Sequence, residues 1–315
     1  MSTGSDVAPY GFETEAGKIF PRYVMYDVNN VCNARCPFCP QSAIAQAAGF
    51  VPQSLAWEDF ETTIREVAQY PVELVRFTGD GEPLLHPRIS DMLALCRDLG
   101  IAKVNLTTNG SLLRGRRLDA ILKTPPQVLD VSLDAFTPAT YAKYRVGLDF
   151  DVTVANVKEF LTRRDPRKTR VVLSIIAHDG MEDEIRDFTE YWKVRADEVA
   201  VRGLHTNLGA VAVAPSPRPR SRWPCPHLWQ RLVVDFRGHI RFCPIDWHDK
   251  SFVGRVGEMT LYDAWHSPQV TSLRRRHLEG DYAGAGVCEN CTDWASTHWG
   301  KSWLDMMTKS ELDVE

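Results

Sequence analysis

The 315-residue sequence predicts an α/β fold, a partial (βα)6 TIM-like barrel followed by a small C-terminal domain. Short β-branched runs alternate with longer amphipathic stretches up to about residue 205, and strands that alternate with helices build parallel sheets. Six such units precede a change of pattern, whereas a closed TIM barrel has eight. After this point prolines and cysteines interrupt the alternation. We therefore expect the barrel at residues 1–205 and a second domain at residues 206–315.

The barrel elements follow from the spacing of the apolar residues, which is helical in the longer stretches and continuous in the short ones. The six expected strands are Tyr23–Val28, Val72–Phe77, Lys103–Thr107, Val128–Leu133, Val171–Ala177 and Glu198–Leu204. The helices expected between them are Trp57–Ala68, Ile89–Leu99, Leu113–Leu122, Val152–Thr162 and Glu182–Lys193.

The second domain is expected to begin with an irregular segment. Residues Ala212–Pro226 contain five prolines and show no periodicity, which predicts a linker or a crossing segment. A hairpin is expected next, with strands at Arg231–Phe236 and His239–Phe242 around a turn at Arg237–Gly238. Two short helices are expected at Leu261–His266 and Val270–His277.

The composition is that of a soluble globular protein, with 44% hydrophobic and 25% charged residues. No apolar run reaches the roughly 18 residues that a membrane span needs, and the N-terminus lacks the basic and apolar regions of a signal peptide. The net charge of −4 argues against nucleic acid as the main partner. We therefore expect a cytoplasmic monomer without a membrane or nucleic-acid partner.

Eight cysteines are the most informative residues of the chain. The cytoplasm keeps thiols reduced, so ligands of a metal or cluster are expected rather than disulfides. The cysteines fall into a group of three, a group of four and one single residue: Cys32, Cys36 and Cys39; Cys225, Cys243, Cys288 and Cys291; and Cys96. Cys96 lies on the apolar face of an expected outer helix, which predicts a small buried hydrophobic residue.

The two groups predict two different centres. The first is a CxxxCxxC sequence directly after the first strand, where barrels of this class bind ligands. Three thiolates hold three irons of a cubane cluster and leave the fourth iron open, whereas zinc would need a fourth ligand nearby. The second group has four cysteines, enough to ligate a centre completely. Its spacing alone allows either zinc or a [4Fe–4S] cluster.

The first cysteine group, with Phe38 before its last cysteine, resembles the signature of the radical S-adenosylmethionine (SAM) superfamily. Further motifs of that family follow in order after successive strands, over about residues 23–204. They are Thr78–Pro83, similar to GGEP but with Asp80 in place of the second glycine; Leu106–Gly110, similar to TNG; Val131–Ala135, similar to SLDG; and Tyr141–Gly147, similar to YxxxRG.

This resemblance implies a [4Fe–4S] cluster on the first three cysteines and SAM beside it. A glycine turn without Cβ atoms lets backbone carbonyls approach the methionine ammonium group. Arg145 is then the expected partner of the methionine carboxylate. The cofactor-binding residues that the resemblance implies are Phe38, Gly79, Asp80, Gly81, Glu82, Thr107, Asn109, Ser132, Asp134, Arg145 and Ile176.

The second cysteine group, preceded by the hairpin and the two short helices, resembles the SPASM and twitch extensions of radical SAM enzymes. Four cysteines match the shorter twitch form, which implies one fully ligated auxiliary [4Fe–4S] cluster. Their spacing is similar to that of aminocyclitol dehydrogenases of antibiotic pathways. Two [4Fe–4S] clusters and SAM are therefore the implied cofactors, and an external electron donor such as flavodoxin or ferredoxin is the implied protein partner.

The expected reaction is removal of a hydrogen atom from a carbinol C–H bond of a sugar, aminosugar or aminocyclitol, followed by oxidation to a ketone. The few residues before the first strand leave no room for a peptide-recognition domain, which favours such a small polyol over a peptide. Candidate catalytic residues are Asp246, Arg202 and His205, and Trp229 and Trp247 are candidates for stacking on a sugar ring.

Three alternatives stay open at this point. The first is an epimerase, which would need a hydrogen-atom donor such as Cys96 or Tyr26. The second is a peptide-modifying SPASM maturase. The third is a protein without catalytic activity, in which iron–sulfur or zinc centres serve as a scaffold.

Overall fold

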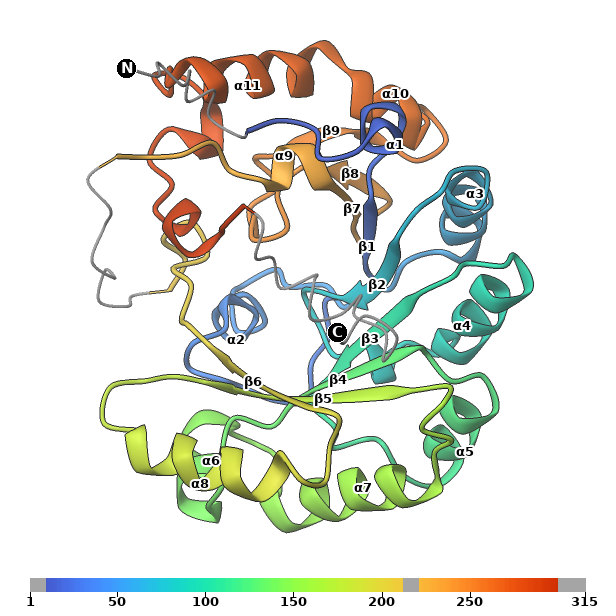
Figure 1. Ribbon diagram of the computed structural model, residues 1–315, viewed down its shortest axis with the longest axis vertical. Helices are drawn as coiled ribbons and strands as arrows, with labels where there is room; N and C mark the ends of the chain where they lie inside the picture. The colour runs from blue at the N-terminus through green and yellow to red at the C-terminus, as the bar shows by residue number, and fades with distance from the viewer. Residues whose placement is uncertain (1–9, 212–220, 300–315) are drawn as a thin grey trace, which may run out of the picture.

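The computed structural model describes residues 10–211 and 221–299 (Figure 1). One nine-stranded sheet runs through the molecule in the order β6-β5-β4-β3-β2-β1-β7-β8-β9. Its first six strands are parallel and correspond to the six expected ones. They are β1 (Tyr23–Asp27), β2 (Leu74–Thr78), β3 (Val104–Thr108), β4 (Val128–Ser132), β5 (Arg170–Ile176) and β6 (Glu198–Arg202).

Helices cover the outer side of the arc that these strands form (Figure 1). The five expected helices are present as α3 (Trp57–Val67), α4 (Ile89–Asp98), α5 (Gly115–Lys123), α7 (Phe150–Arg163) and α8 (Glu182–Trp192). The sequence analysis missed four short helices: α1 (Glu15–Ile19), α2 (Pro40–Ile44), α6 (Pro138–Tyr144) and α9 (His227–Gln230). Segments of four to seven residues are too short for an apolar period to be recognised. The α/β partial barrel is confirmed.

The two faces of the sheet differ in chemistry. Outward-facing residues such as Val75 and Phe77 pack under the helices in the main core, together with Phe60 and Ile64 of α3. The inner face carries a separate apolar layer near the start of the strands, formed by Tyr23, Leu74, Val128, Val172 and Ala200. Side chains alternate along a strand, so the residues between the outward-facing ones line the barrel interior.

The C-terminal part extends the same sheet. Strand β7 (Arg231–Val234) pairs in parallel with β1, and β8 (His239–Arg241) and β9 (Phe252–Arg255) follow antiparallel. The expected hairpin is therefore confirmed, whereas the edge strand β9 was not expected. Helices α10 (Leu261–His266) and α11 (Pro268–Glu279) agree with the expected pair, and the short turns η1 (Pro83–Leu85), η2 (Gly286–Cys288) and η3 (Asp293–Ser296) complete the fold.

The connection between β6 and β7 crosses from one edge strand of the barrel to a strand beside β1. Most of the expected proline-rich segment, residues 212–220, lies outside the described residues, as does the N-terminal stretch 1–9. The boundary near residue 205 stays a prediction.

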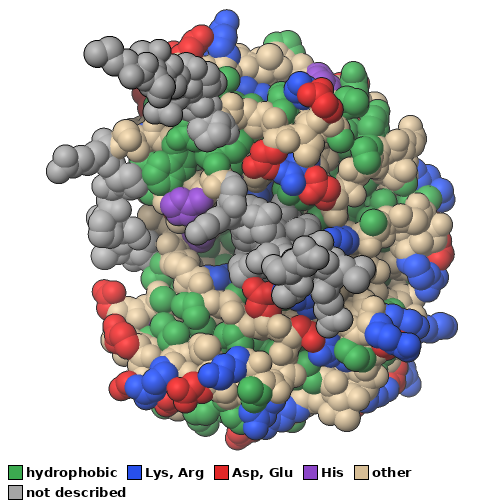
Figure 2. Space-filling model, in the orientation of Figure 1, with side chains coloured by type: hydrophobic (Ala, Val, Ile, Leu, Met, Phe, Trp, Pro, Cys, Tyr) green, Lys and Arg blue, Asp and Glu red, His purple; other side chains and the backbone are tan. Residues whose placement is uncertain are grey.

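The visible helical rim carries charges of both signs, with Lys and Arg side chains interspersed among Asp and Glu (Figure 2). This is the usual surface of solvated helices that bury only one face. Within residues 10–211 and 221–299, no helix has the length and apolar character that crossing a bilayer requires.

A buried arginine joins the hairpin to the barrel. Arg241 of β8 is 1% exposed and forms an ion pair with Asp27 at the end of β1. Its guanidinium also lies 3.9 Å from a carboxylate oxygen of Asp80 and 3.9 Å from one of Asp235. A second nitrogen donates to the backbone carbonyl of Asp246. The cation thus contacts groups from three separate segments of the chain.

Replacing this cation should destabilise the whole fold. In Arg241→Met the carboxylate of Asp27 stays buried without its cation, and breaking a buried pair in this way costs about 3–5 kcal/mol. We expect the free energy of unfolding to fall by this amount in chemical denaturation. Arg65→Met is the matched control, because Arg65 is exposed and pairs with Glu61 at the surface, where loss of a pair costs about 1 kcal/mol or less. Equal stability of the two variants would contradict this role of Arg241.

Candidate active site

A cavity of about 200 Å³ opens at the carboxyl ends of the first four strands. All three cysteines of the first group line it. Of the other predicted cofactor residues, the cavity wall includes Phe38, Gly79, Gly81, Glu82, Thr107, Asn109, Ser132 and Arg145. It also includes Gln41 and Ser42, which sequence reasoning missed, and Thr78 and Thr108, which stand in the quoted motifs but were not predicted as site residues. Asp80, Asp134 and Ile176 of the predicted set are not part of this wall.

The glycines after β2 are required by close contacts within the protein. A Cβ atom on Gly81 would lie 1.9 Å from the side-chain oxygen of Asn29 and 2.4 Å from the carbonyl oxygen of Val31. Gly79 has φ +113°, and a Cβ there would lie 1.9 Å from a carboxylate oxygen of Asp27. The turn therefore packs directly on the end of β1, and glycine keeps this part of the cavity wall in place.

Glu82 is buried in this wall and hydrogen-bonded within the chain. Its carboxylate accepts hydrogen bonds from the hydroxyl of Thr108 (2.5 Å) and the backbone N–H groups of Asn109 (2.8 Å) and Leu84 (3.1 Å). Burial raises the pKa of Glu82, and these hydrogen bonds oppose the shift. Glu82 thus fixes the turn after β3 relative to the glycine turn after β2.

Asp80 points toward the hairpin. It stands where the family pattern has a second glycine, and its carboxylate lies 3.9 Å from the Arg241 guanidinium. Burial raises the pKa of Asp80 to about 6, and Arg241 opposes this shift. The structure therefore places this residue, predicted to bind cofactor, in the contact between the barrel and the C-terminal hairpin.

Arg145 and Asp134 form a buried ion pair beside the cysteines. Asp134 also accepts the backbone N–H of Ile176 at 2.8 Å, which uses the second oxygen of its carboxylate. A guanidinium nitrogen of Arg145 lies 3.7 Å from the sulfur of Cys36, and the ring of Phe38 lies 5.7 Å away. Arg145 thus lines the cavity as predicted. Asp134 orients its guanidinium, and the backbone N–H of Ile176 in turn positions Asp134.

Of the first three cysteines, Cys36 is buried and Cys32 and Cys39 are half-buried, which suits ligands of a cationic centre. Burial raises the pKa of Cys32 to about 11 and that of Cys39 to about 12. A thiolate is costly in such surroundings unless a metal compensates its charge. The backbone N–H of Ala34 points at the sulfur of Cys32 at 3.4 Å, as is common for cluster ligands.

The barrel interior holds a polar layer next to this cavity. Arg202 donates to a carboxylate oxygen of Asp130 at 2.8 Å, and a nitrogen of Arg76 lies 3.8 Å from the same oxygen. Arg76 also donates to the hydroxyl of Thr107 at 3.1 Å. Of these four residues, Arg76 and Asp130 were missed. Each could have been found as the one charged residue of its strand, Arg76 in LVRFT of β2 and Asp130 in VLDVS of β4.

The other two predicted catalytic residues lie in loops, Asp246 in the loop after β8 and His205 shortly after β6. Asp246 is buried and accepts the backbone N–H groups of His248 (3.1 Å) and Ser251 (2.5 Å), so it holds the loop after β8. His205 lies 3.0 Å from the hydroxyl of Ser296. Of the two tryptophans, Trp229 is 2% exposed and offers no free face for a sugar, and Trp247 donates to the side chain of Asn207 at 3.3 Å.

The four cysteines of the second group line one second cavity. They come from segments far apart in sequence, before α9, after β8, and within and after η2. Burial raises the pKa of Cys225 to about 11 and that of Cys288 to about 12. Four thiols around one cavity, one buried and three half-buried, have the donor set of a fully ligated metal or iron–sulfur centre.

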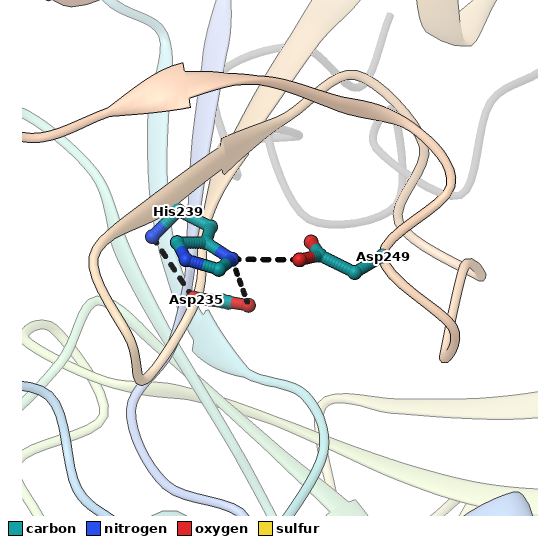
Figure 3. A group of neighbouring side chains, drawn as sticks. All are labelled: Asp235, His239 and Asp249. Carbon is teal, nitrogen blue, oxygen red and sulfur yellow. Dashed lines mark hydrogen bonds and ion pairs between the residues drawn. The ribbon is translucent and has the colours of Figure 1, made fainter.

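A third group with ligand-type side chains lies on the hairpin (Figure 3). Nδ1 of His239 lies 2.7 Å from a carboxylate oxygen of Asp249 and 4.0 Å from one of Asp235. The guanidinium of Arg237 already lies 2.5 Å from Asp235 and 3.3 Å from Asp249. This arginine supplies the positive charge at that place, so the group ties the hairpin turn to the following loop.

The sequence matches the Radical SAM superfamily over residues 26–191, which is more than half of the chain. This chain belongs to the radical SAM superfamily. Residues 225–292 match the SPASM family, described as an iron–sulfur cluster-binding domain. The radical SAM protein therefore uses SAM and two iron–sulfur clusters. The cysteines of the first cavity would hold the first cluster, and those of the second cavity would hold the other.

Among curated relatives, GTP 3′,8-cyclase of Limosilactobacillus fermentum is 30% identical over 176 residues, 54% of this chain and 50% of that protein. The corresponding enzyme of Alkaliphilus metalliredigens is 31% identical over 172 residues, 53% of this chain and 51% of that protein. The chain thus spans about half the length of these relatives. The named relatives are cyclases and not sugar-modifying dehydrogenases.

Two solved structures are similar over most of the chain. The complex of BtrN with AdoMet and 2-DOIA has a TM-score of 0.63 at 17% identity, and the match covers 90% of this chain and 97% of BtrN. SuiB of Streptococcus suis bound to the precursor peptide SuiA has a TM-score of 0.69 at 14% identity, over 87% of this chain and 71% of SuiB. At these identities the similarity establishes the fold.

The two cysteine groups of the radical SAM protein should be separable by mutation. Replacing Cys32, Cys36 and Cys39 together by Ala should remove about half of the iron and all SAM cleavage, because the second cavity keeps its four ligands. Iron and sulfide analysis of anaerobically reconstituted protein measures the first effect, and release of methionine measures the second. Complete loss of iron, or continued SAM cleavage, would contradict the assignment.

Gly81→Ala should weaken SAM binding in the same protein. The new Cβ would overlap Asn29 and the backbone of Val31, so the turn that forms one wall of the cavity must move. We expect at least a tenfold loss of SAM affinity in equilibrium dialysis. Gly203→Ala serves as the control, since a Cβ there meets nothing within 4 Å. Unchanged affinity in Gly81→Ala would show that the turn does not shape the SAM site.

Proposed function

We propose that this radical SAM enzyme oxidises a carbinol group of a sugar, aminosugar or aminocyclitol to a ketone. The observation that carries the proposal is the second cavity, where four cysteines suffice to ligate every iron of a cubane cluster. A fully ligated cluster has no open iron for substrate, which suits an electron acceptor. The similarity to BtrN over 97% of that chain supports a substrate of this class.

Removing a carbinol hydrogen atom leaves a substrate radical on that carbon, which must lose one more electron to become a ketone. A proton must leave the hydroxyl group and an electron must leave the carbon. When bound, SAM and the first cluster supply the carbon radical that removes the hydrogen atom. We propose that the auxiliary cluster accepts the remaining electron and that an external donor such as flavodoxin or ferredoxin reduces the first cluster.

The polar layer inside the barrel supplies groups for a polyol. Asp130 is fully buried, and Arg202 and Thr107 hold one of its oxygens, while no residue among 10–211 and 221–299 hydrogen-bonds to the other. That oxygen is buried in the barrel interior beside the cavity, and we propose that it accepts the proton or a hydrogen bond of a substrate hydroxyl there. We therefore propose the Asp130–Arg202 pair, rather than Asp246 or His205, as the group that binds and deprotonates the reacting alcohol.

Epimerisation is less consistent with the positions of the two hydrogen-atom donors considered. Cys96 is fully buried in α4, outside the barrel. Tyr26 is also fully buried and its hydroxyl bonds to Thr63 of α3 at 3.1 Å, on the outer face of the sheet. Neither side chain faces the interior. We further propose that the enzyme acts as a cytoplasmic monomer without nucleic-acid or membrane partners.

Nucleotide cyclisation is the second candidate function, and the 30% identity to GTP 3′,8-cyclase over 54% of this chain favours it. The peptide-bound neighbour SuiB keeps peptide modification as a third outcome, although this chain corresponds to 71% of SuiB. Both of these reactions would use SAM in the first cavity, and they differ in the substrate that the barrel interior must accommodate.

Product analysis in deuterated water tests the proposal. The reduced enzyme, SAM and a panel of aminocyclitols, aminosugars, GTP and peptides are incubated anaerobically, and products are identified by mass spectrometry. A ketone two mass units lighter than its polyol, without solvent deuterium on the reacting carbon, is the expected result. An inverted carbinol carrying one deuterium would establish an epimerase, and a cyclised nucleotide would establish a cyclase.

Asp130→Asn tests the proposed site residue in the same assay. Loss of the proton acceptor should lower ketone formation by about 10²-fold while SAM cleavage continues. Asp119→Asn is the matched control, because Asp119 lies on the exposed face of α5. Equal ketone formation in both variants would remove Asp130 from the proposed mechanism.

A further inference from the structure

His277 is a buried residue of the second cavity that neither the sequence analysis nor the proposed reaction uses. It lies on α11, whose buried residues Val270, Leu273, Arg274 and His277 follow the spacing of one helix face. This face brings the imidazole, which is 1% exposed, to the cavity that the four cysteines line.

One nitrogen of this imidazole has a fixed role. The backbone N–H of the cluster ligand Cys225 donates to Nδ1 of His277 at 3.2 Å. Because Nδ1 accepts this hydrogen bond, it carries no proton itself, and the ring is the neutral imidazole. In a neutral imidazole with Nδ1 as acceptor, Nε2 carries the proton.

The other nitrogen therefore offers a buried N–H group. Nε2 has no hydrogen-bond partner among residues 10–211 and 221–299. An N–H left without an acceptor in the interior is unfavourable, so buried donors are normally satisfied. The rings of Tyr282 and Trp229 pack on the imidazole with centroids at 5.0 Å and 6.4 Å and hold it in place. Among the described residues, His277 lines the cavity of the four cysteines, where a cluster sulfur can supply the acceptor.

We infer that Nε2–H of His277 donates a hydrogen bond to a sulfur atom of the auxiliary iron–sulfur cluster and thereby raises its reduction potential. Reduction adds negative charge to the cluster, and an N–H donor stabilises the more negative state. The same ring accepts the N–H of Cys225, so it also positions the first ligand of this cluster. His277 is a positioning residue that acts through the cluster.

This role is independent of the substrate. A higher potential makes the auxiliary cluster a better electron acceptor, whichever radical supplies the electron. The inference rests on the SPASM cysteines and on the geometry of α11, so it can fail while the proposed reaction holds, and the reverse is equally true.

The test uses the full chain with Cys32, Cys36 and Cys39 replaced by Ala, so that only the auxiliary cluster is present. Redox titration followed by electron paramagnetic resonance gives its midpoint potential without any substrate. His277→Phe keeps a planar ring but removes both nitrogens, and we expect a lower potential. His277→Gln keeps a neutral N–H donor and should retain more of the parental potential. His266→Phe, an exposed histidine on α10, should leave it unchanged.

A second measurement addresses the hydrogen bond directly. Pulsed electron paramagnetic resonance of the reduced cluster, in protein labelled with ¹⁵N-histidine, should detect a histidine nitrogen and an exchangeable proton, and both signals should disappear in His277→Phe. This readout needs only the parental cluster, so it decides even if His277→Phe fails to assemble one. An unchanged potential in His277→Phe, or the absence of histidine coupling in the parental protein, would overturn the inference.

Discussion

The buried guanidinium of Arg241 is the contact on which the relative position of the two cofactor regions depends. Its carboxylate partners belong to the end of β1, to the glycine turn after β2 and to the hairpin itself. Carboxylates crowded together in the interior repel one another and lose solvation, so they can stay charged only around a shared cation. The hairpin, and with it the second cysteine group, is therefore held against the SAM cavity from one side.

Different parts of the sheet form the SAM cavity, the polar layer and the connection to the auxiliary cavity. The carboxyl ends of β1–β4 form the SAM cavity, as expected for a parallel barrel, and the inner face beside it carries the Arg76, Asp130 and Arg202 layer. Strand β7 pairs with β1 and leads from the barrel to the auxiliary cavity. The inner face thus carries this polar layer next to the cavity and the apolar layer of Tyr23, Leu74, Val128, Val172 and Ala200 near the start of the strands.

Several acidic residues that look functional in the sequence serve other charged or polar groups of the chain. Asp134 orients Arg145, Asp80 faces Arg241, and Asp246 holds a loop through two backbone N–H groups. The partners of Asp134 and Asp80 lie on other elements, whereas those of Asp246 lie in its own loop, and in each case the partner determines whether the carboxylate can face a ligand. Glu82 differs, since it both lines the cavity and satisfies the turn after β3.

The sequence by itself determined the α/β class, the six parallel strands, their helices and the grouping of cysteines into three and four, because apolar periodicity and ligand spacing are local properties. Tertiary structure alone decided that Arg76, Asp130 and Arg202 share one layer and that His277 reaches the cysteine cavity. These contacts join residues tens of positions apart. They depend on strand register and helix packing, which follow from the hydrogen bonds and buried surfaces of the whole molecule.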